Sequence, residues 1–424
     1  MIYNIVIYFV LLGIAIASLF NEKVRKMWRG EREAFKILKQ KVDPNAKYIW
    51  FHAASLGEFE QGRPLMEQIR KDYPQYKILL TFYSPSGYEV RKNYEGADII
   101  CYMPVDTRLN AIRFLRLVRP VMAFFIKYEF WSNFLHILKH RNIPTYSVSS
   151  IFREDQVFFK WYGRSYANVL KCFTRFFVQN EESKQLLESI GIKDVDVVGD
   201  TRFDRVLQIK EAAKHLPICE AFRNGVAGSD SAASSEKASH PDYKVFVAGS
   251  SWPPDEEIFI RFFNEHKDWR LLIAPHVIAE EHLKLILSLL KDKKVVRYTQ
   301  TTPEEAAKAD VLIIDCFGLL SSMYNYGDVA YIGGGFGVGI HNTLEAAVWN
   351  MPVIFGPNNK KFQEALGLLK SGGGFEINDY EDFEGLMSKL MNDEAYLKKS
   401  GDEAGAFVAS LSGATDKVLA KVTL

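Results

Sequence analysis

Short apolar runs alternate with longer segments of mixed polarity along most of the chain. In the first half these runs are rich in β-branched and aromatic residues, as in YIWFH and VMAFFI, which favours strands buried on both faces. The segments between the runs have helical spacing of their apolar residues. The expected strands are 48–52, 77–82, 99–102, 121–126, 145–149, 176–178 and 196–198, and the expected helices are 59–71, 86–93, 109–117, 131–140 and 183–190.

The same alternation resumes in the second half, with helices expected between the strands. Strands that alternate with helices indicate a parallel sheet covered on both faces. The pattern therefore predicts two Rossmann-like, doubly wound α/β halves that face a central cleft, with ligand-binding loops after the strands. The strands expected here are 244–248, 269–273, 295–296, 311–314, 329–332 and 352–355.

The N-terminal segment has a different pattern. Residues 2–20 carry no charge, and a helix of that length spans about 28 Å, close to the thickness of a bilayer core. Lys23, Arg25 and Lys26 follow directly, and cationic residues on that side place it in the cytoplasm. A signal peptide is the alternative, but its basic residues would precede the apolar stretch. Residues 1–21 are therefore predicted to form a single-pass membrane anchor.

The composition of the remaining chain suggests where its domains are separated and which partners are excluded. An N-terminal domain over 22–208 and a C-terminal domain over 209–424 are expected, with a hinge near 205–214. Ser, Ala and Gly dominate 224–241, which is expected to be an exposed flexible loop. The formal net charge of +1 argues against nucleic acid as a partner. The four cysteines lack C-x-x-C spacing, which disfavours a disulfide framework or a zinc knuckle.

A glycine-rich turn is the strongest chemical signal. Glycines let the backbone approach a ligand closely, and the N-terminus of a following helix offers N–H groups to a phosphate. A carboxylate one turn into that helix suits ribose hydroxyls. No G-x-G-x-x-G register fits, which disfavours a dinucleotide site, and glycines needed only for tight packing are the alternative. The turn and the helix expected after it contain Gly333, Gly334, Gly335, Gly337, Gly339, His341, Asn342 and Glu345.

Two carboxylates follow strands of the first half. Glu58 ends the run HAASLGE after the strand 48–52, and Glu129 lies in KYEFWSN after the strand 121–126. At the edge of a cleft, Glu58 suits a general base, and Glu129 suits binding an acceptor or orienting Glu58. The structural alternatives are that Glu58 only stabilises a helix dipole and that Glu129 only caps the next helix.

Ser250 and Ser251 follow the strand 244–248 in GSSW and are expected to open a helix. Their hydroxyls suit a phosphate or a carboxylate, and either serine is equally suited to be a plain N-cap. His136 and His140 share a helix face but lack the H-E-x-x-H pattern, so no metal site is predicted. The sequence also contains neither a nucleophilic serine elbow nor a P-loop.

Taken together, these motifs resemble the 3-deoxy-D-manno-octulosonic acid (Kdo) transferases of lipid A assembly. The segments match the family in order over nearly the whole chain. FHAASLGE stands where the family has HAxSxGE, and KYEFWSN where it has a run like ETELWPN. The other matching segments are MPVDT, VQNEESKQLL, GDTRFD, GSSW, IGGGF with HNTLEA, and FGPNNKKFQEA.

The resemblance implies a two-domain GT-B glycosyltransferase that inverts the anomeric carbon without a metal or other cofactor. Its N-terminal domain would bind a lipid A precursor, with Glu58 as catalytic base and Glu129 as a second catalytic carboxylate. Its C-terminal domain would bind CMP-Kdo and stabilise the leaving CMP at the helix N-terminus. The acceptor residues implied are Ser55, Gly57 and Arg153, and the donor residues are Ser250, Ser251, Pro275, His276, Gly333, Gly334, Gly335, Gly339, His341, Asn342 and Glu345.

The chain departs from the family pattern near both sites. Lys127 replaces the first acidic residue of the ETELWPN-like run. Pro275-His276 stands where the family has Pro-Arg-His, so a cation expected near the donor is missing. His276, Arg202 or Lys361 would have to replace it.

The expected location is the cytoplasmic face of the inner membrane, where the anionic surface attracts the basic segment after the anchor. Two alternatives remain for the function. The first is a GT-B transferase that uses a different nucleotide sugar. The second is a non-catalytic, membrane-tethered binder of nucleotides or lipids.

Overall fold

The computed structural model describes residues 2–225 and 243–423, which form two compact units. Unit 1 contains Met1–Arg205 and Leu411–Leu424, and unit 2 contains Val206–Ser410. The C-terminal segment therefore groups with unit 1, whereas the sequence placed everything after residue 208 in the second domain. Nearly all of the expected flexible loop, 224–241, lies outside the described residues.

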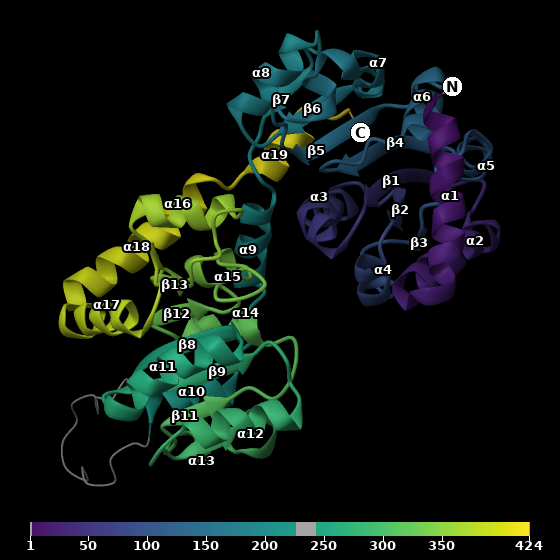
Figure 1. Ribbon diagram of the computed structural model, residues 1–424. Helices are drawn as coiled ribbons and strands as arrows, with labels where there is room; N and C mark the ends of the chain where they lie inside the picture. The colour runs from purple at the N-terminus through teal and green to yellow at the C-terminus, as the bar shows by residue number, and fades with distance from the viewer. Residues whose placement is uncertain (1, 226–242, 424) are drawn as a thin grey trace. The chain divides into compact units, whose positions relative to one another are not determined.

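Unit 1 is built on a parallel seven-stranded sheet with the strand order β3-β2-β1-β4-β5-β6-β7 (Figure 1). Along β1, Tyr48 and Trp50 enter the core on one face of the sheet, while Ile49 and Phe51 enter the core on the other. Burial on both faces explains why the strands appear in the sequence as continuous apolar runs. The strands are β1 (Lys47–Ala53), β2 (Tyr76–Phe82), β3 (Ile99–Tyr102), β4 (Pro120–Ile126), β5 (Thr145–Ser150), β6 (Arg175–Val178) and β7 (Val195–Val197).

Helices connect these strands, as the alternating pattern predicted. The last helix, α19 (Ala414–Leu419), is held on unit 1 by Asp204, which accepts hydrogen bonds from the backbone N–H of Gly413 at 2.5 Å and of Thr415 at 2.7 Å. The other helices after the N-terminal pair are α3 (Leu56–Asp72), α4 (Pro85–Arg91), α5 (Arg108–Val118), α6 (Ser132–His140), α7 (Arg164–Ala167) and α8 (Glu181–Ser189), with 3-10 turns at Val157–Phe159, Trp161–Gly163 and Leu170–Cys172.

Unit 2 repeats the architecture with the strand order β10-β11-β9-β8-β12-β13-β14, again entirely parallel. Its strands are β8 (Lys244–Ser251), β9 (Trp269–Pro275), β10 (Val295–Arg297), β11 (Val311–Ile313), β12 (Val329–Ile332), β13 (Val353–Phe355) and β14 (Gly374–Glu376). Its helices are α10 (Pro217–Asn224), α11 (Pro253–Glu265), α12 (Glu280–Leu289), α13 (Pro303–Ala306), α14 (Leu320–Met323), α15 (Leu344–Ala347), α16 (Gln363–Ser371), α17 (Tyr380–Asn392) and α18 (Glu394–Ser410), with 3-10 turns at Tyr298–Gln300 and Tyr324–Tyr326. Helix α9 (Arg202–Glu211) carries the chain from unit 1 into unit 2.

The first helix, α1 (Ile2–Phe20), is long and apolar enough to cross a membrane, and it lies along unit 1 (Figure 1). Near its start, the Tyr3 hydroxyl donates to the carboxylate of buried Asp106 at 2.6 Å, and Asn133 Nδ2 donates to Asn4 Oδ1 at 2.8 Å. At its other end, Arg25 of α2 (Glu22–Lys41) donates to the carbonyl oxygens of Ser18 and Leu19. Hydrogen bonds therefore hold both ends of α1 to the rest of unit 1.

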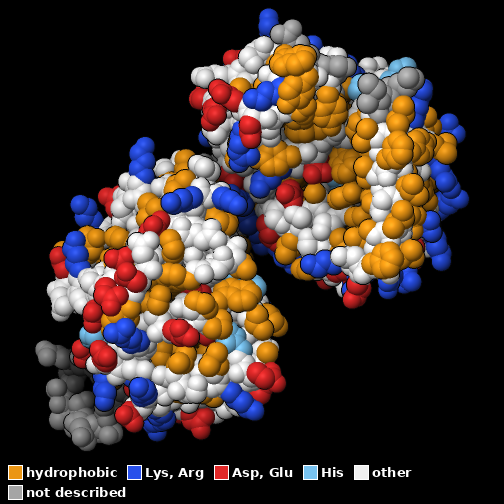
Figure 2. Space-filling view, in the orientation of Figure 1, with side chains coloured by type: hydrophobic (Ala, Val, Ile, Leu, Met, Phe, Trp, Pro, Cys, Tyr) orange, Lys and Arg blue, Asp and Glu red, His pale blue; other side chains and the backbone are white. Residues whose placement is uncertain are grey.

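The opposite face of α1 is exposed. Its large apolar residues recur at the spacing of one helix face, and Figure 2 shows them as a column of hydrophobic side chains bordered by Lys and Arg. Phe9 is 70% exposed and Phe20 85% exposed. We call this surface the α1 stripe, and it consists of Ile5, Tyr8, Phe9, Leu12, Ile16, Leu19 and Phe20.

Two local expectations were wrong. Strand β8 continues through Ser250 and Ser251, and the next helix starts at Pro253 with Trp252 as its N-cap, so neither serine opens or caps it. The helix after the glycine turn begins at Leu344 and has only four residues, so His341 and Asn342 precede it and do not form the N-terminus of a long helix.

Candidate active site

In unit 1 the strand order reverses between β1 and β4, because β2 and β3 extend the sheet one way and β5 to β7 the other. Open α/β sheets bind ligands beyond the carboxyl ends of their strands at such a point. Glu58 lies in the first turn of α3, directly after β1, and Glu129 lies between β4 and α6. Both carboxylates chosen from the sequence therefore follow the two strands that flank the switch point.

Glu129 is fixed by two aromatic side chains. Its Oε2 lies 3.0 Å from His52 Nε2 and accepts a hydrogen bond of 2.6 Å from Trp131 Nε1. His52 is fully buried in β1, and its Nδ1 lies 2.9 Å from Thr81 Oγ1. A carboxylate oxygen accepts, so His52 Nε2 donates to Glu129, while the Thr81 hydroxyl accepts from Trp50 Nε1 at 2.8 Å and donates to the Phe51 carbonyl at 3.3 Å. Glu129 thus has a buried scaffold and does not cap α6, whose N-cap is Trp131.

The candidate base is held by its own helix start. Ser55 is the N-cap of α3, but its hydroxyl donates to the Glu58 carboxylate and makes no capping bond to the backbone. Glu58 is half-buried, and the neighbouring Gly57 is exposed. The hydrogen bond from Ser55 fits a carboxylate that is held in place for catalysis. The position of Glu58 in the first turn also fits stabilisation of the helix dipole, so the structure supports both interpretations.

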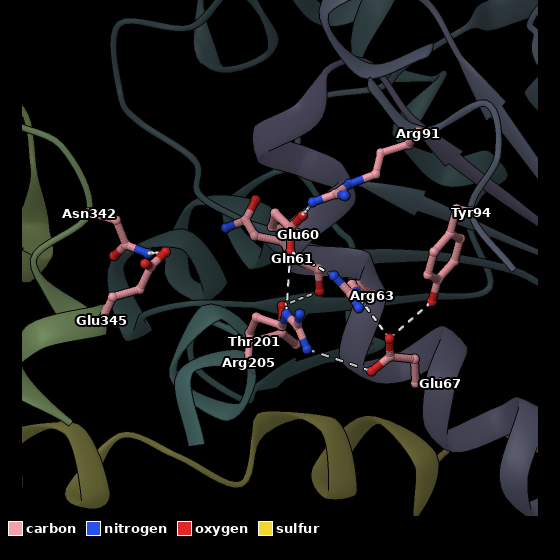
Figure 3. A network of polar contacts seen from close by, with 10 residues as sticks. All are labelled: Glu60, Gln61, Arg63, Glu67, Arg91, Tyr94, Thr201, Arg205, Asn342 and Glu345. Carbon is pink, nitrogen blue, oxygen red and sulfur yellow. Dashed lines mark hydrogen bonds and ion pairs between the residues drawn. The ribbon is translucent and has the colours of Figure 1, made fainter. Parts of the chain in front are cut away.

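Helix α3 is also tied to the segment that leads out of unit 1 (Figure 3). The Thr201 hydroxyl donates to the Gln61 carbonyl at 2.5 Å. Gln61 Nε2 also donates to buried Asp200 at 3.0 Å. Arg205 pairs with Glu60 at 3.3 Å and with Glu67 at 3.7 Å. This network connects the GDTRFD segment to the helix that carries Glu58.

Non-glycine residues with left-handed backbone occur at the carboxyl ends of three strands. Lys127 follows β4 with φ 61°, Ser149 lies in β5 with φ 57°, and Ser250 lies in β8 with φ 52°. This conformation costs about 1–3 kcal/mol for a non-glycine residue and is concentrated at functional sites. Lys127 and Ser250 both belong to motifs selected from the sequence.

Unit 2 has its switch point between β8 and β12, the strands that lead into GSSW and into the glycine turn. The backbone of the turn packs directly on β8. Gly333 donates to the Gly249 carbonyl at 3.0 Å, and a Cβ atom on Gly333 would lie 2.3 Å from the Ser250 carbonyl oxygen. At least part of the glycine signal therefore comes from tight packing, the alternative left open by the sequence.

A buried carboxylate organises the turn. Asp255 of α11 accepts hydrogen bonds from the Tyr331 hydroxyl at 2.8 Å and from the backbone N–H groups of Gly334 and Trp252, both at 2.9 Å. The N–H groups of Gly337, Gly339 and His341 donate to carbonyl groups inside the turn. A phosphate at this turn must therefore rely on other donors than these.

The two serines differ in accessibility. Ser251 is fully buried and donates to Glu256 at 2.7 Å, so its hydroxyl supports α11 and does not face a ligand. Ser250 is half-buried, and its left-handed backbone marks the bulge between β8 and β9. Of the pair, only Ser250 is partly exposed.

Three rings stack at the end of β9. His276 lies between Trp252 and His341, with ring centroids 4.8 and 4.4 Å away. Trp252 Nε1 donates to His341 Nε2 at 3.2 Å. Burial, with a smaller effect of His276, lowers the pKa of His341 to about 4. His341 is therefore neutral near pH 7, and because Nε2 accepts, its proton sits on Nδ1 as a donor.

Asn342 and Glu345 contact each other at the start of α15 (Figure 3). Asn342 Nδ2 donates to Glu345 Oε1 at 2.9 Å, and Asn342 Oδ1 accepts from the Leu344 N–H at 3.1 Å. A pocket of about 100 Å³ lies beside the turn. It is lined by Trp252, Pro254, Asp255, Gly334, Phe336, Gly337 and Val338.

The remaining site candidates are exposed, already paired or, for Pro275, buried. Arg153 follows β5 and is exposed. Arg202, a candidate replacement cation, pairs with Asp200 in unit 1 at 2.8 Å. Lys361 is exposed in unit 2, and Pro275 ends β9 in the core. Within the described ranges, no group of three His, Cys, Asp or Glu residues is placed to hold a metal ion.

Comparison with known sequences identifies the relatives of this chain. The family described as 3-deoxy-D-manno-octulosonic-acid transferase (kdotransferase) matches residues 29–205. The 3-deoxy-D-manno-octulosonic acid transferase of Aquifex aeolicus is 25% identical over 374 residues, which cover 86% of this chain and 92% of the relative. The corresponding transferase of Haemophilus influenzae is 26% identical over 392 residues, covering 89% and 86%. That of Rickettsia felis is 26% identical over 386 residues, covering 88% and 78%.

Solved structures share the fold of two α/β units in one chain. The UDP-GlcNAc 2-epimerase of Neisseria meningitidis, bound to UDP-GlcNAc, aligns with a TM-score of 0.57 at 14% identity and covers 88% of this chain and 98% of its own. MurG of Acinetobacter baumannii aligns with a TM-score of 0.52 at 12% identity, covering 88% and 98%. At these identities the likeness shows the fold alone, and it confirms the predicted GT-B class.

Proposed function

We propose that this chain, which is similar to Kdo transferases over most of its length, transfers Kdo from CMP-Kdo to a lipid A precursor with inversion at the anomeric carbon. The observation that carries the proposal is the placement of the family motifs. HAASLGE and KYEFWSN lie at the switch point of unit 1, and GSSW and the glycine turn lie at the switch point of unit 2. Each unit therefore offers one ligand site where open α/β sheets bind ligands.

Unit 2 is proposed to hold the donor. Asn342 and Glu345 would contact the ribose and phosphate, and Ser250 and His276 would line the same site. The neutral His341 offers its Nδ1–H to the phosphate, since its Nε2 is occupied by Trp252. This side-chain donor replaces the helix N-terminus expected from the sequence, because α15 is too short to supply one.

Unit 1 is proposed to bind the acceptor and supply the base. The acceptor hydroxyl loses its proton to Glu58, and its oxygen forms a bond to the anomeric carbon of Kdo. The bond from that carbon to the CMP phosphate breaks, and CMP leaves with the negative charge. A single displacement of this kind inverts the anomeric centre. Glu129, held by His52 and Trp131, is proposed to orient the reacting groups, and Ser55 keeps Glu58 in place.

The direct test is to incubate the protein with CMP-Kdo and a tetraacylated lipid A precursor and to weigh the products. We expect lipid products heavier by whole Kdo residues together with released CMP, and the mass also counts the residues added. Thermal shifts with CMP and with UDP identify the nucleotide in parallel. Stabilisation by UDP and not by CMP, with no Kdo product, would assign the protein to a different nucleotide sugar.

We propose that the enzyme works at the cytoplasmic face of the inner membrane and that α1 attaches it there. The sequence predicted a single-pass helix, but the contacts favour a different placement. A helix of this length that crossed the bilayer would carry its first turn about 28 Å away from the cytoplasmic side. Tyr3 and Asn4 instead bind Asp106 and Asn133 of the catalytic unit. We therefore infer from these two hydrogen bonds that both ends of α1 stay on the cytoplasmic side, with the α1 stripe in contact with the lipid.

A protease-accessible tag joined to Met1 tests this placement. In intact spheroplasts we expect external protease to leave the tag uncut, because both ends of α1 stay on the cytoplasmic side. In inverted membrane vesicles the same tag should be cut. A tag joined to Leu424 is the control, since it is cytoplasmic in either topology. Cleavage of the Met1 tag in intact spheroplasts would restore the single-pass interpretation.

A further inference from the structure

A pocket between α1, α2 and α5 lies outside the candidate active site. Its volume is about 310 Å³. Its walls combine apolar side chains with two arginines, an amide and a carboxyl group. The lining residues are Leu11, Trp28, Glu31, Arg32, Phe35, Val105, Asn110 and Arg113. We call it the α2 pocket.

Aromatic rings hold both arginines. The Arg32 guanidinium lies 4.3 Å from the centre of the Trp28 ring, and that of Arg113 lies 4.5 Å from the centre of the Phe35 ring. Stacking orients a guanidinium plane and leaves its N–H edge for hydrogen bonds. Two oriented guanidinium groups at one pocket favour an anion with several oxygen acceptors, and phosphate matches their fork geometry.

Glu31 is the unusual member of the pocket. It is only 4% exposed, and neither carboxyl oxygen has a hydrogen-bond partner among the described residues. A buried polar group without a partner is costly, so one that persists calls for an explanation such as a missing ligand. The next residue back, Gly30, packs on Tyr102 so closely that a Cβ atom would meet its ring, which fixes α2 at this point.

Burial raises the pKa of Glu31 to about 8. The charged and titratable groups around it are Tyr83 and Tyr102 from the sheet side and Arg32 and Arg113 at the pocket. Burial also raises the pKa of both tyrosines above the usual value, so they stay neutral. Below about pH 8 Glu31 is therefore a neutral acid that can donate one hydrogen bond and does not repel an anion.

The position of the pocket selects the source of the anion. Leu11 of α1 forms one wall, and the other face of α1 carries the α1 stripe. Helix α2 adds Lys23, Arg25, Lys26 and Arg29, which suit an anionic headgroup layer. The α2 pocket therefore lies directly behind the lipid-facing helix α1, on the helix α2 that carries this cationic surface.

We propose that the α2 pocket binds the phosphomonoester headgroup of a membrane lipid, with Arg32 and Arg113 on the phosphate oxygens, Glu31 as a neutral donor, and Leu11 and Phe35 against the lipid body. The assignment does not depend on the transfer reaction, because binding is measured without a sugar donor. With such a site, the protein would bind membranes that contain this headgroup more tightly than other anionic membranes, which a basic surface alone does not distinguish.

Vesicle binding of the full-length protein tests the proposal. The vesicles are phosphatidylcholine alone, phosphatidylcholine with phosphatidic acid, and phosphatidylcholine with phosphatidylglycerol as an anionic diester. The Arg32→Gln/Arg113→Gln double variant is compared with Lys36→Gln/Arg116→Gln, which removes the same charge from the same two helices outside the pocket. We expect the pocket variant to lose about tenfold more affinity for phosphatidic acid vesicles than the control variant.

Each alternative result is decisive. Equal losses in the two double variants, or equal binding to phosphatidic acid and phosphatidylglycerol, would reduce the pocket to general surface electrostatics. Binding of inorganic phosphate alone with the same strength would make it a site for soluble phosphate and overturn the lipid assignment. Thermal unfolding of both double variants near that of the wild type confirms that folding is not the cause.

The Glu31→Gln variant tests the role of the carboxyl group. Glutamine keeps a hydrogen-bond donor and cannot ionise. At pH 7 we expect the variant and the wild type to prefer phosphatidic acid vesicles equally. At pH 9 the wild type should weaken relative to the variant, because Glu31 ionises above about pH 8 and repels the phosphate. A constant ratio between the two proteins at both pH values would remove Glu31 from the binding site.

Discussion

Glu58→Gln is expected to abolish most of the proposed Kdo transfer while leaving donor binding intact. The amide can still accept the Ser55 hydrogen bond but cannot take a proton, so the loss in kcat should be about 10²- to 10⁴-fold. CMP binding should not change, because the proposed donor residues lie in unit 2. The measurement is a single-turnover assay with CMP-Kdo, together with a CMP titration.

Asp72→Asn is the matched control for this change. Asp72 lies at the other end of α3, is exposed, and accepts a hydrogen bond from the side chain of Gln68 one turn earlier on the same helix. It should keep wild-type turnover. If folded Glu58→Gln turned over CMP-Kdo at the wild-type rate, the base would have to be another group, and Glu129 would be the next candidate.

Gly333→Ala is expected to destabilise unit 2 strongly. The added methyl group would lie 2.3 Å from the Ser250 carbonyl oxygen and 2.6 Å from the Ser251 Cα atom. Because both neighbours are backbone atoms, no side chain can rotate away. Overpacking costs about 1–3 kcal/mol, and we expect the upper end, near 3 kcal/mol. For a unit of this size that corresponds to a melting temperature lower by roughly 6–12 °C.

Gly337→Ala is the control within the same turn. A Cβ atom there meets nothing within 4 Å, and its φ is not in the left-handed region. The expected change in stability is within about 0.5 kcal/mol. Differential scanning calorimetry of the two variants measures the difference. Equal melting temperatures would mean that the turn does not approach β8 as closely as the structure shows.

Most of the fold was predictable from local pattern. The strand expected at 48–52 is β1 at Lys47–Ala53, and the strand expected at 329–332 is β12 with the same bounds. Central parallel strands are apolar on both faces, so a short stretch of sequence identifies them. The edge strand β14, with the sequence GFE, was missed because three residues at the edge of a sheet show no such run.

The sequence predicted which residues belong to the candidate site, but only partly which side chains surround them. Their position after two strands selected Glu58 and Glu129 and placed them at an edge of the sheet, and the family resemblance implied their catalytic roles. The sequence did not reveal that His52 and Trp131 hold Glu129, or that Ser251 is turned into the core towards Glu256. The contact of Glu129 with His52 joins segments that are far apart in the sequence, and the direction of the Ser251 side chain depends on the bulge in β8. The local spacing of apolar residues predicts neither.

The sequence by itself determined two α/β units, an apolar N-terminal helix and the motifs of a Kdo transferase. Only the tertiary structure decided that Tyr3 reaches Asp106, that Asp204 binds the C-terminal segment to unit 1, and that Ser250 makes Gly333 obligatory. The physical reason is the range of each interaction. Burial imposes a period on neighbouring residues, whereas hydrogen bonds and backbone contacts between distant segments depend on which elements the folded chain places next to each other.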